Sequence, residues 1–196
     1  MAAWLLVPLG YLLGSLSSAV LISRLFSLPD PRQEGSKNPG ATNVLRLGGK
    51  KAGALTLLGD ALKGLIAVLL AAKLSGEPAL IAATGAAAFL GHLYPVFFGF
   101  KGGKGVATAL GVLSGFNGWV GLSVLSTWIA IAILFRISSL SALVAAALAP
   151  LYVWYFQDSG LLVVASSAMS LFLIYRHKAN IQRLLRGEES RIGQKS

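Results

Sequence analysis

The chain has 196 residues, of which 55% are hydrophobic and only 12% charged, and its mean hydropathy is +0.72. Soluble domains carry about 25% charged residues, so this composition excludes an ordinary soluble domain and indicates that lipid covers much of the surface. The net charge of +10 is compatible with nucleic acid, anionic lipid or phosphorylated substrates, and the lack of cysteine excludes disulfides, thiolate metal sites and a cysteine nucleophile.

Apolar runs follow one another along the whole chain, and a bilayer core of about 30 Å needs roughly 20 helical residues. The predicted helices lie near 4–23, 54–72, 79–98, 106–116, 118–135, 140–156 and 161–177. The fourth is short, and we expect it to be tilted or broken at 102–105. The first run lacks a basic leader and a cleavage site, so we interpret it as a retained helix. The sequence therefore predicts one all-α domain over 1–196, a polytopic membrane bundle of seven transmembrane helices.

The placement of Lys and Arg tests this count independently. With the N-terminus outside and seven crossings, all but two of the 17 basic residues fall in cytoplasmic segments, as the positive-inside rule requires. The exceptions are Lys63, within the second run, and Lys73, outside. If the fourth run did not cross, Arg136 and the basic tail would lie outside. We therefore expect a cytoplasmic C-terminus in a bacterial inner membrane, and topology explains the basic charge without a nucleic-acid partner.

The first polar segment joins the first two predicted helices and covers 35–43, followed by Arg46. Its polar side chains are the neutral hydroxyls and amides of Ser, Asn and Thr. With glycine backbone and a guanidinium, these groups suit a cluster of anionic oxygens. The alternative is a merely solvated basic loop, although such a loop usually mixes Lys with Glu.

The second polar segment covers 101–108, between the third and fourth predicted helices. Consecutive glycines and the start of a helix form an anion site, to which Lys104 would add a mobile charge. The segment does not match a Walker A loop, because Gly105 stands where Ser or Thr is required. His92 precedes the segment and is equally compatible with a packing role and a site role.

The third polar segment covers 176–183, at the end of the last predicted helix. His177 and Asn180 share a face if the helix continues. His177 could donate to a phosphate when protonated or accept a proton from a hydroxyl when neutral. Arg176 and Lys178 are interpreted as the basic end of a membrane helix.

Asp60 and Lys63 lie three residues apart within the second predicted helix. Charges inside a membrane span are costly, so we expect an internal ion pair that shapes the floor of the site, with a proton relay as the alternative. No two acids form a metal-spaced pair within the predicted site, so we expect no metal and no other cofactor. The His-x-x-x-x-Asp signature of acyl-CoA-dependent glycerophosphate acyltransferases is also absent.

Four stretches in this order resemble the bacterial acyl-phosphate-dependent glycerol-3-phosphate acyltransferases. They are 35–43, the helix with Asp60 and Lys63, 91–97 together with 101–108, and 177–189. The resemblance covers essentially the whole chain. It implies a metal-free, seven-helix enzyme that transfers a fatty-acyl group from acyl phosphate, and not from acyl-CoA, to the 1-hydroxyl of glycerol 3-phosphate. The products would be lysophosphatidic acid and inorganic phosphate, in the first committed step of phospholipid synthesis.

The resemblance also implies residue roles. Ser36 and Arg46 would contact substrate phosphate, Gly102, Gly103 and Lys104 would form the glycerol-3-phosphate site, and His177 and Asn180 would complete the catalytic centre. We place Ser36 and Lys104 among the catalytic residues. The further residues predicted to bind substrate are Asn38, Thr42, Asn43, His92, Lys101 and Thr108.

Positioning two phosphate-bearing substrates can supply roughly 7–11 kcal/mol without an enzymic nucleophile. We prefer His177 as a phosphate ligand, with a role as general base second and a substrate phosphate as another possible proton acceptor. The competing class is a small transporter of anions or organophosphates, which intramembrane charges would suit. However, the polar segments gather at one face and no repeat is visible, and a non-enzymatic scaffold would not need the glycine-rich segment. We expect acyl phosphate, glycerol 3-phosphate and membrane lipids as partners of a monomer.

Overall fold

The computed structural model describes residues 2–193, which form helices and connecting segments with no strand. The ends of the predicted domain, residue 1 and residues 194–196, lie outside this range. In chain order the elements are η1 (Ala2–Leu5), α1 (Leu6–Gly14), α2 (Ser18–Leu25), α3 (Ala41–Leu74), α4 (Pro78–Leu93), η2 (Val96–Phe98), α5 (Val106–Phe116), α6 (Gly118–Phe135), α7 (Ser138–Phe156), α8 (Gly160–Arg176) and α9 (Lys178–Leu185). The predicted all-α class is confirmed.

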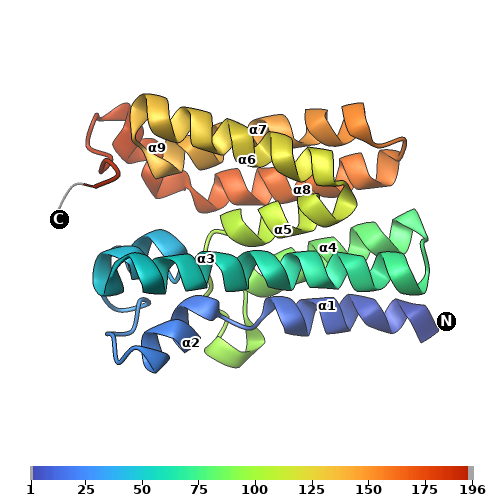
Figure 1. The fold of residues 1–196 in the computed structure, drawn as a ribbon, viewed down its shortest axis with the longest axis horizontal. Coiled ribbons are helices and arrows are strands. Elements are labelled where there is room, and N and C mark those ends of the chain that lie inside the picture. Colours follow the sequence, from blue (N-terminus) through green and yellow to red (C-terminus); the bar gives the residue numbers. More distant parts are fainter. Residues whose placement is uncertain (1, 194–196) are drawn as a thin grey trace.

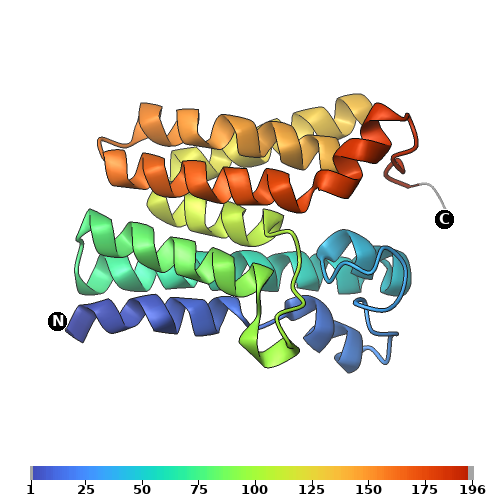
Figure 2. The ribbon, with the colours of Figure 1, turned by 180° about the vertical axis from the view of Figure 1, so that it is seen from behind.

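The long helices run roughly parallel, and α5 lies between two groups of helices (Figure 1). On one side α5 packs along α3, which also contacts α1 and α4. On the other side α5 meets α6, which packs on α7, and α7 packs on α8 (Figure 2). The main apolar core runs through this centre and includes Phe89, Leu93, Val112 and Val153, all almost fully buried.

The outer faces of the bundle carry large apolar side chains, as an integral membrane protein requires. Among the described residues, four helices are long and apolar enough to cross a membrane, and the number rises to six if each of two bent pairs forms one span. The short helix α5 matches its predicted range of 106–116. Whether α5 is a seventh crossing stays a prediction, as does the orientation of the two termini.

Two predicted spans are not continuous helices. The run near 4–23 breaks between α1 and α2, which meet at 41°, and the run near 79–98 is α-helical only to Leu93, before the short turn η2. The last predicted span, 161–177, corresponds to the continuous helix α8, and the chain bends by 59° into α9 just after it. An unbroken apolar run does not reveal such a break, because hydropathy reports side chains and not backbone geometry. Backbone groups freed at a break need partners inside the protein, and between α1 and α2 the carbonyl oxygen of Leu16 accepts from Lys63.

The second predicted helix, 54–72, lies inside a longer helical element. This element, α3, begins at Ala41 and continues to Leu74, with non-helical backbone at Gly49, where φ is 79°. A short helix before Gly49 and a longer one after it meet there in a kink, and the longer one contains the predicted span. Part of the first polar segment is thus helical, and the expected loop is shorter than predicted.

Glycines allow the closest helix contacts. A Cβ atom at Gly14 of α1 would lie 2.0 Å from the carbonyl oxygen of Ala88 in α4, and one at Gly111 of α5 would lie 1.9 Å from that of Ala61 in α3. No side chain fits at such distances, so the small residues let the backbones touch. Gly14 and Gly111 therefore serve helix packing.

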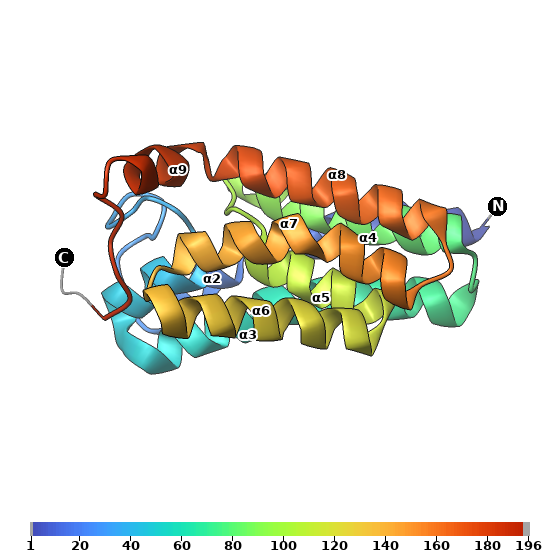
Figure 3. The same ribbon diagram turned by 90° about the horizontal axis from the view of Figure 1, so that it is seen from above.

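All three polar segments gather at one end of the bundle. Figure 3 shows α9 and the C-terminal tail at the same end as α2 and the start of α3, and the N-terminus lies at the opposite end. The bend after α8 turns α9 across this end. Residues far apart in the chain are thereby brought around one cavity.

Candidate active site

The cavity at the polar end has a volume of about 650 Å³ and is open on one side. That volume is typical of a small-molecule site. It is bounded by the segment before α3, the starts of α5 and α7, and the bend into α9. The predicted site residues that line it are Ser36, Asn38, Thr42, Asn43, Arg46, Asp60, His92, Lys104, His177 and Asn180.

Asn43 shapes the first polar segment from within. Its side-chain amide donates to the carbonyl oxygens of Pro31 and Glu34, both at 3.0 Å, and its Oδ1 accepts from the backbone N–H of Ser36 at 3.1 Å. With an exposed fraction of 1%, Asn43 acts mainly as a support for the loop. Ser36 and Arg46 remain at the cavity surface.

Lys104 and Asn180 join the second and third segments. The Lys104 ammonium donates to Asn180 Oδ1. Burial, and the positive charges of Arg183, Arg176 and Arg46, lower the pKa of Lys104 to about 8. The carboxylate of Glu189 acts in the opposite direction and raises this pKa, so burial and the guanidinium groups together outweigh it. The neighbouring start of α5 also faces the cavity, with Gly105, Val106 and Ala107 in its lining.

The two glycines before Lys104 pack against His92, and their expected part in the glycerol-3-phosphate site stays a prediction. The N–H of Gly103 donates to the carbonyl oxygen of His92 at 3.2 Å, so this N–H is already occupied. A Cβ at Gly102 would lie 2.0 Å from that carbonyl oxygen, and one at Gly103 would lie 2.4 Å from His92 Nε2. Glycine is required here because the loop packs directly on His92. The backbone near the cavity is instead the start of α5.

Arg176 was wrongly interpreted as a basic helix end at the membrane surface. Its Nη2 donates to the carbonyl oxygens of Gly102 and Gly103, at 3.1 and 3.2 Å, and its guanidinium lies 5.7 Å from the ring centre of Tyr94. Arg176 thus fastens the glycine loop to the end of α8. Lys178, by contrast, is exposed and lies over the ring of Tyr175.

His177 occupies the bend between α8 and α9 and has an exposed fraction of 3%. Its Nδ1 lies 2.8 Å from the carbonyl oxygen of Leu173. A carbonyl can only accept, so Nδ1 carries a proton, and in the neutral ring Nε2 is free to accept one. The helix does not continue straight as expected, but His177 and Asn180 are both buried and both line the cavity.

Glu189 is a cavity residue that the sequence analysis did not assign to the site. Its carboxylate accepts from Ser139 Oγ at 2.7 Å, and from Asn180 Nδ2 and Arg183 Nε at 2.6 Å each. Burial alone would raise the pKa of Glu189, but these hydrogen bonds outweigh burial and lower it. Glu189 therefore remains a carboxylate that orients Asn180 toward Lys104.

The C-terminal tail closes one side of the cavity. Ser190 accepts from Arg46 Nη2 at 2.7 Å, and the backbone of Ile192 pairs with Arg136 between α6 and α7. The only signals for this in the sequence were Glu188 and Glu189, two acids in an otherwise basic tail. A basic tail is usually interpreted as solvated, and local sequence patterns do not reveal contacts with residues as distant in the chain as Arg136 and Arg46.

The expected ion pair between Asp60 and Lys63 is confirmed, at 2.9 Å, with both side chains buried. His92 Nδ1 joins the pair at 2.9 Å from Lys63 Nζ. Besides Gly102 and Gly103, two further predicted substrate residues do not line the cavity. Lys101 is exposed and does not line the cavity, and Thr108 is fully buried in α5.

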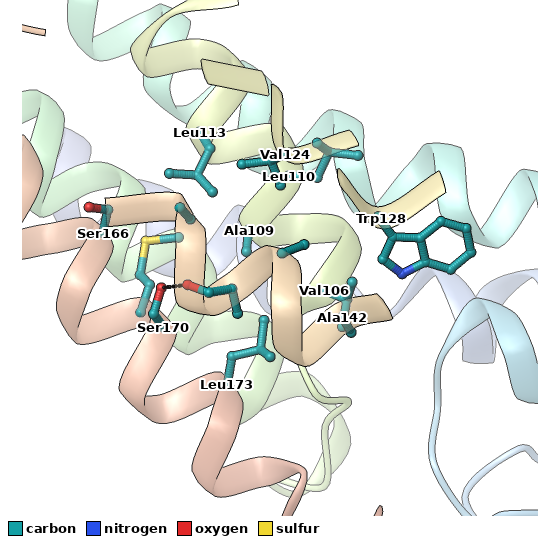
Figure 4. A pocket seen from close by; sticks show the side chains of 14 residues that line it. Val106, Ala109, Leu110, Leu113, Val124, Trp128, Ala142, Ser166, Ser170 and Leu173 are labelled. Atoms are coloured by element: carbon teal, nitrogen blue, oxygen red, sulfur yellow. Dashed lines mark hydrogen bonds between the residues drawn. The ribbon is translucent and has the colours of Figure 1, made fainter. Parts of the chain in front are cut away.

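An apolar crevice of about 40 Å³ continues from the cavity between α5, α6, α7 and α8 (Figure 4). Val106, Trp128 and Ala142 line both spaces. A row of alanines along α7 leaves room on one wall, and Ser170 keeps its hydroxyl satisfied by donating to the carbonyl oxygen of Ala146 at 2.7 Å. A polar, cationic cavity that opens into an apolar crevice defines the class: a membrane protein whose site suits an anionic head group with an apolar chain.

Comparisons with known proteins identify the family. The model of the glycerol-3-phosphate acyltransferase family matches residues 4–187. Glycerol-3-phosphate acyltransferases from Methylococcus capsulatus and Thioalkalivibrio sulfidiphilus are 69% and 58% identical, covering 98% and 95% of this chain and 97% and 92% of their own lengths. The chain belongs to the glycerol-3-phosphate acyltransferase family.

Solved structures agree with this assignment. Crystal structures of PlsY, an integral membrane glycerol 3-phosphate acyltransferase, superpose with TM-scores of 0.94 for its glycerol 3-phosphate form and 0.92 for its lysophosphatidic acid form. Their sequences are 43% and 42% identical, and each match covers 98% of this chain and 96% of the other. The chain is an integral membrane acyltransferase, and the alternative of a transporter is not supported.

Proposed function

We propose that the chain transfers a fatty-acyl group from acyl phosphate to the 1-hydroxyl of glycerol 3-phosphate, without a metal ion. The observation that carries the proposal is one cavity in which Arg46, Lys104 and the start of α5 face each other, joined to an apolar crevice. Two phosphate groups and one acyl chain fit this distribution of charge and apolar surface. The family and the PlsY structures support glycerol 3-phosphate as acceptor and lysophosphatidic acid as product.

In the proposed reaction the 1-hydroxyl oxygen attacks the acyl carbonyl carbon, and the bond from that carbon to the phosphate oxygen breaks. Inorganic phosphate leaves with the electron pair of the broken bond. Acyl phosphate is already activated, so the protein needs to supply no nucleophile. Lys104 and Arg46 offset the repulsion between the two phosphates, and oriented donors such as Asn180 contribute on the order of 3 kcal/mol each toward the developing oxyanion.

The proton of the attacking hydroxyl needs an acceptor. In our proposal His177 is first a phosphate ligand that orients the substrate and second a general base through Nε2, and a substrate phosphate is the other possible acceptor. The hydrogen bond from Nδ1 to Leu173 supports both roles, because it fixes the ring and leaves Nε2 available. A His177→Gln variant with near-full turnover would contradict both.

The crevice of Figure 4 is proposed to receive the first carbons of the acyl chain. Its volume of about 40 Å³ is too small for a whole fatty-acyl chain, so the remainder would extend along α6 and α7 toward lipid. The exposed apolar side chains of Ile133 and Leu134 on α6 are compatible with that path.

We further propose seven crossings by a monomer in the inner membrane, with the cavity at the cytoplasmic face. The basic residues support this orientation, because Arg46, Lys104, Arg176 and Arg183 all lie at the cavity end, while Lys73 lies at the other end of α3. Under the positive-inside rule the cavity end is cytoplasmic. Acyl phosphate would then enter from the lipid phase and glycerol 3-phosphate from the cytosol.

The donor is tested by phosphate release from purified protein in lipid, supplied with glycerol 3-phosphate and either palmitoyl phosphate or palmitoyl-CoA. We expect release of phosphate and formation of lysophosphatidic acid with palmitoyl phosphate alone, at the same rate in EDTA. Turnover with palmitoyl-CoA, or loss of turnover in EDTA, would contradict the proposal.

A further inference from the structure

The buried pair of Asp60 and Lys63 has a second partner that connects it with the cavity. Lys63 Nζ lies 2.9 Å from Asp60 Oδ1, 2.9 Å from His92 Nδ1 and 2.7 Å from the carbonyl oxygen of Leu16. An ammonium group has three N–H donors and no acceptor. Lys63 is hydrogen-bonded to His92 and Leu16 and forms an ion pair with Asp60. The Leu16 carbonyl lies in the break between α1 and α2, where the helix leaves it without a backbone partner.

This geometry determines where the proton of His92 lies. Two groups lie near His92 Nδ1: Lys63 Nζ at 2.9 Å and the Asp60 Oδ1 acceptor at 3.6 Å. Because the nearer group, the charged Lys63, can only donate, Nδ1 accepts from it, and the neutral ring then carries its proton on Nε2. The Nε2 atom lies against Gly103, where a Cβ would approach it to 2.4 Å, and His92 lines the cavity. His177 has the opposite arrangement, since its Nδ1 donates to Leu173.

We infer that Asp60 and Lys63 are positioning residues that hold His92 with its Nε2–H toward the cavity, where it donates to the phosphate of glycerol 3-phosphate beside the start of α5. The inference rests on the proposed function, because it takes the anion in the cavity to be this substrate. Asp60 keeps Lys63 charged, Lys63 selects the tautomer of His92, and His92 provides the donor. An ion pair that served only helix packing would not need a histidine at the wall of the cavity.

The glycine-containing loop, 101–105, also depends on His92. The backbone of His92 accepts from the Gly103 N–H, and its ring packs beneath Gly103. A Cβ at Gly103 would also lie 2.9 Å from the carbonyl oxygen of Pro39, in the first polar segment. A ring that turned about its Cβ–Cγ bond would move the Nε2–H away from the cavity and disturb the contact between the first and second segments.

The tautomer can be measured without turnover. The chain has two histidines, so ¹⁵N-histidine labelling of the full protein in lipid gives four ring-nitrogen signals, and a His177→Gln sample assigns them. We expect a protonated Nε2 and an unprotonated Nδ1 for His92, with the reverse for His177. In Lys63→Met the preference of His92 should be lost. A protonated Nδ1 on His92 in the wild type would overturn the inference.

Kinetics test the consequence. Losing one charge-assisted hydrogen bond to phosphate should raise KM for glycerol 3-phosphate at least about tenfold in Lys63→Met, and leave KM for palmitoyl phosphate within about twofold. The double variant Asp60→Leu with Lys63→Met removes the unpaired carboxylate, so it should recover the thermal stability but not the low KM. Recovery of both would show that the pair only supports folding and would overturn the inference.

The tautomer measurement and the kinetic measurement together separate this inference from the proposed function. The tautomer is read without substrate, so a wild-type protein that lacked acyl transfer but showed the expected signals would count against the proposed function alone. A wild-type protein active on palmitoyl phosphate, with an unchanged KM for glycerol 3-phosphate in Lys63→Met, would count against the inference alone.

Discussion

At the scale of single residues, the charge on Lys104 is the property most sensitive to conditions. Its pKa is lowered to about 8 by burial and by neighbouring guanidinium groups. A lysine is positive below its pKa and neutral above it, so the attraction for phosphate is present at neutral pH and is lost as the pH rises through about 8. The free enzyme's kcat/KM for glycerol 3-phosphate reports this ionisation.

We therefore predict that kcat/KM for glycerol 3-phosphate falls above about pH 8 in the wild type. In Lys104→Arg the guanidinium stays charged across this range, so the fall should disappear even if the maximal rate is lower. The measurement is a pH profile of phosphate release from pH 6 to 10 for both proteins. An identical alkaline fall in the variant would assign the ionisation to another group.

The sequence predicted the partners and positions of site residues where these depend on residue type and spacing. The buried pair of Asp60 and Lys63 followed from the cost of charge in a membrane, and His177 and Asn180 from their place at a helix end. Arg176 and Glu189 were not assigned to the site because their partners are distant in the chain. Lys101 was assigned to it because it neighbours the glycines, although its side chain points to the exterior.

At the scale of elements, one of the closest contacts is between α1 and α4. A methyl group at Gly14 would meet the backbone of Ala88 at 2.0 Å, so the helices must separate to accept it. We predict that Gly14→Ala lowers the stability by about 1–3 kcal/mol, as overpacking does. The thermal midpoint of loss of activity, or of helical circular dichroism, measures this change.

Gly118 provides the matched control for that substitution. It also lies in a helix, at the start of α6, but an added Cβ there meets no atom within 4 Å. Gly118→Ala should leave the thermal midpoint within a degree or two of the wild type. Equal midpoints for the two variants would mean that α1 and α4 do not pack as closely as described.

Element boundaries were predicted well where a run of apolar residues ends at a polar one. This holds for α5 and for α6, whose bounds coincide with the predicted 106–116 and 118–135. It fails for α3, because polar residues such as Thr42 and Arg46 are compatible with either loop or helix and only packing decides. The sequence also did not predict the bends between α1 and α2 and between α8 and α9, because both occur inside or directly beside apolar sequence.

At the scale of the whole molecule, the number of crossings is the expectation with the largest consequence. If α5 crosses with the other six spans, the N-terminus and the cavity lie on opposite sides of the membrane. The lack of cysteine makes this testable, since single cysteines can be introduced into an otherwise unreactive chain. We predict that a membrane-impermeant thiol reagent labels Ser75→Cys from outside intact cells.

The same experiment has a counterpart at the cavity end. Lys178→Cys, exposed after the bend from α8, should react only after the cells are opened. Both variants should remain active, because neither residue lines the cavity. Labelling of both positions from outside would contradict an odd number of crossings. It would mean that α5 does not cross and that Arg136 and the basic tail lie outside the cell.

The central claim is that the cavity at the polar end is where glycerol 3-phosphate reacts. Lys104 and Lys101 lie in the same loop and carry the same charge, but Lys104 lines the cavity and Lys101 is exposed outside it. The most direct measurement is therefore phosphate release from palmitoyl phosphate, as a function of glycerol 3-phosphate, for Lys104→Ala and Lys101→Ala. We predict a loss of kcat/KM on the order of 10²-fold for Lys104→Ala and less than about twofold for Lys101→Ala. Equal losses in the two variants would show that the loop contributes only general positive charge, and would contradict the placement of the active site in this cavity.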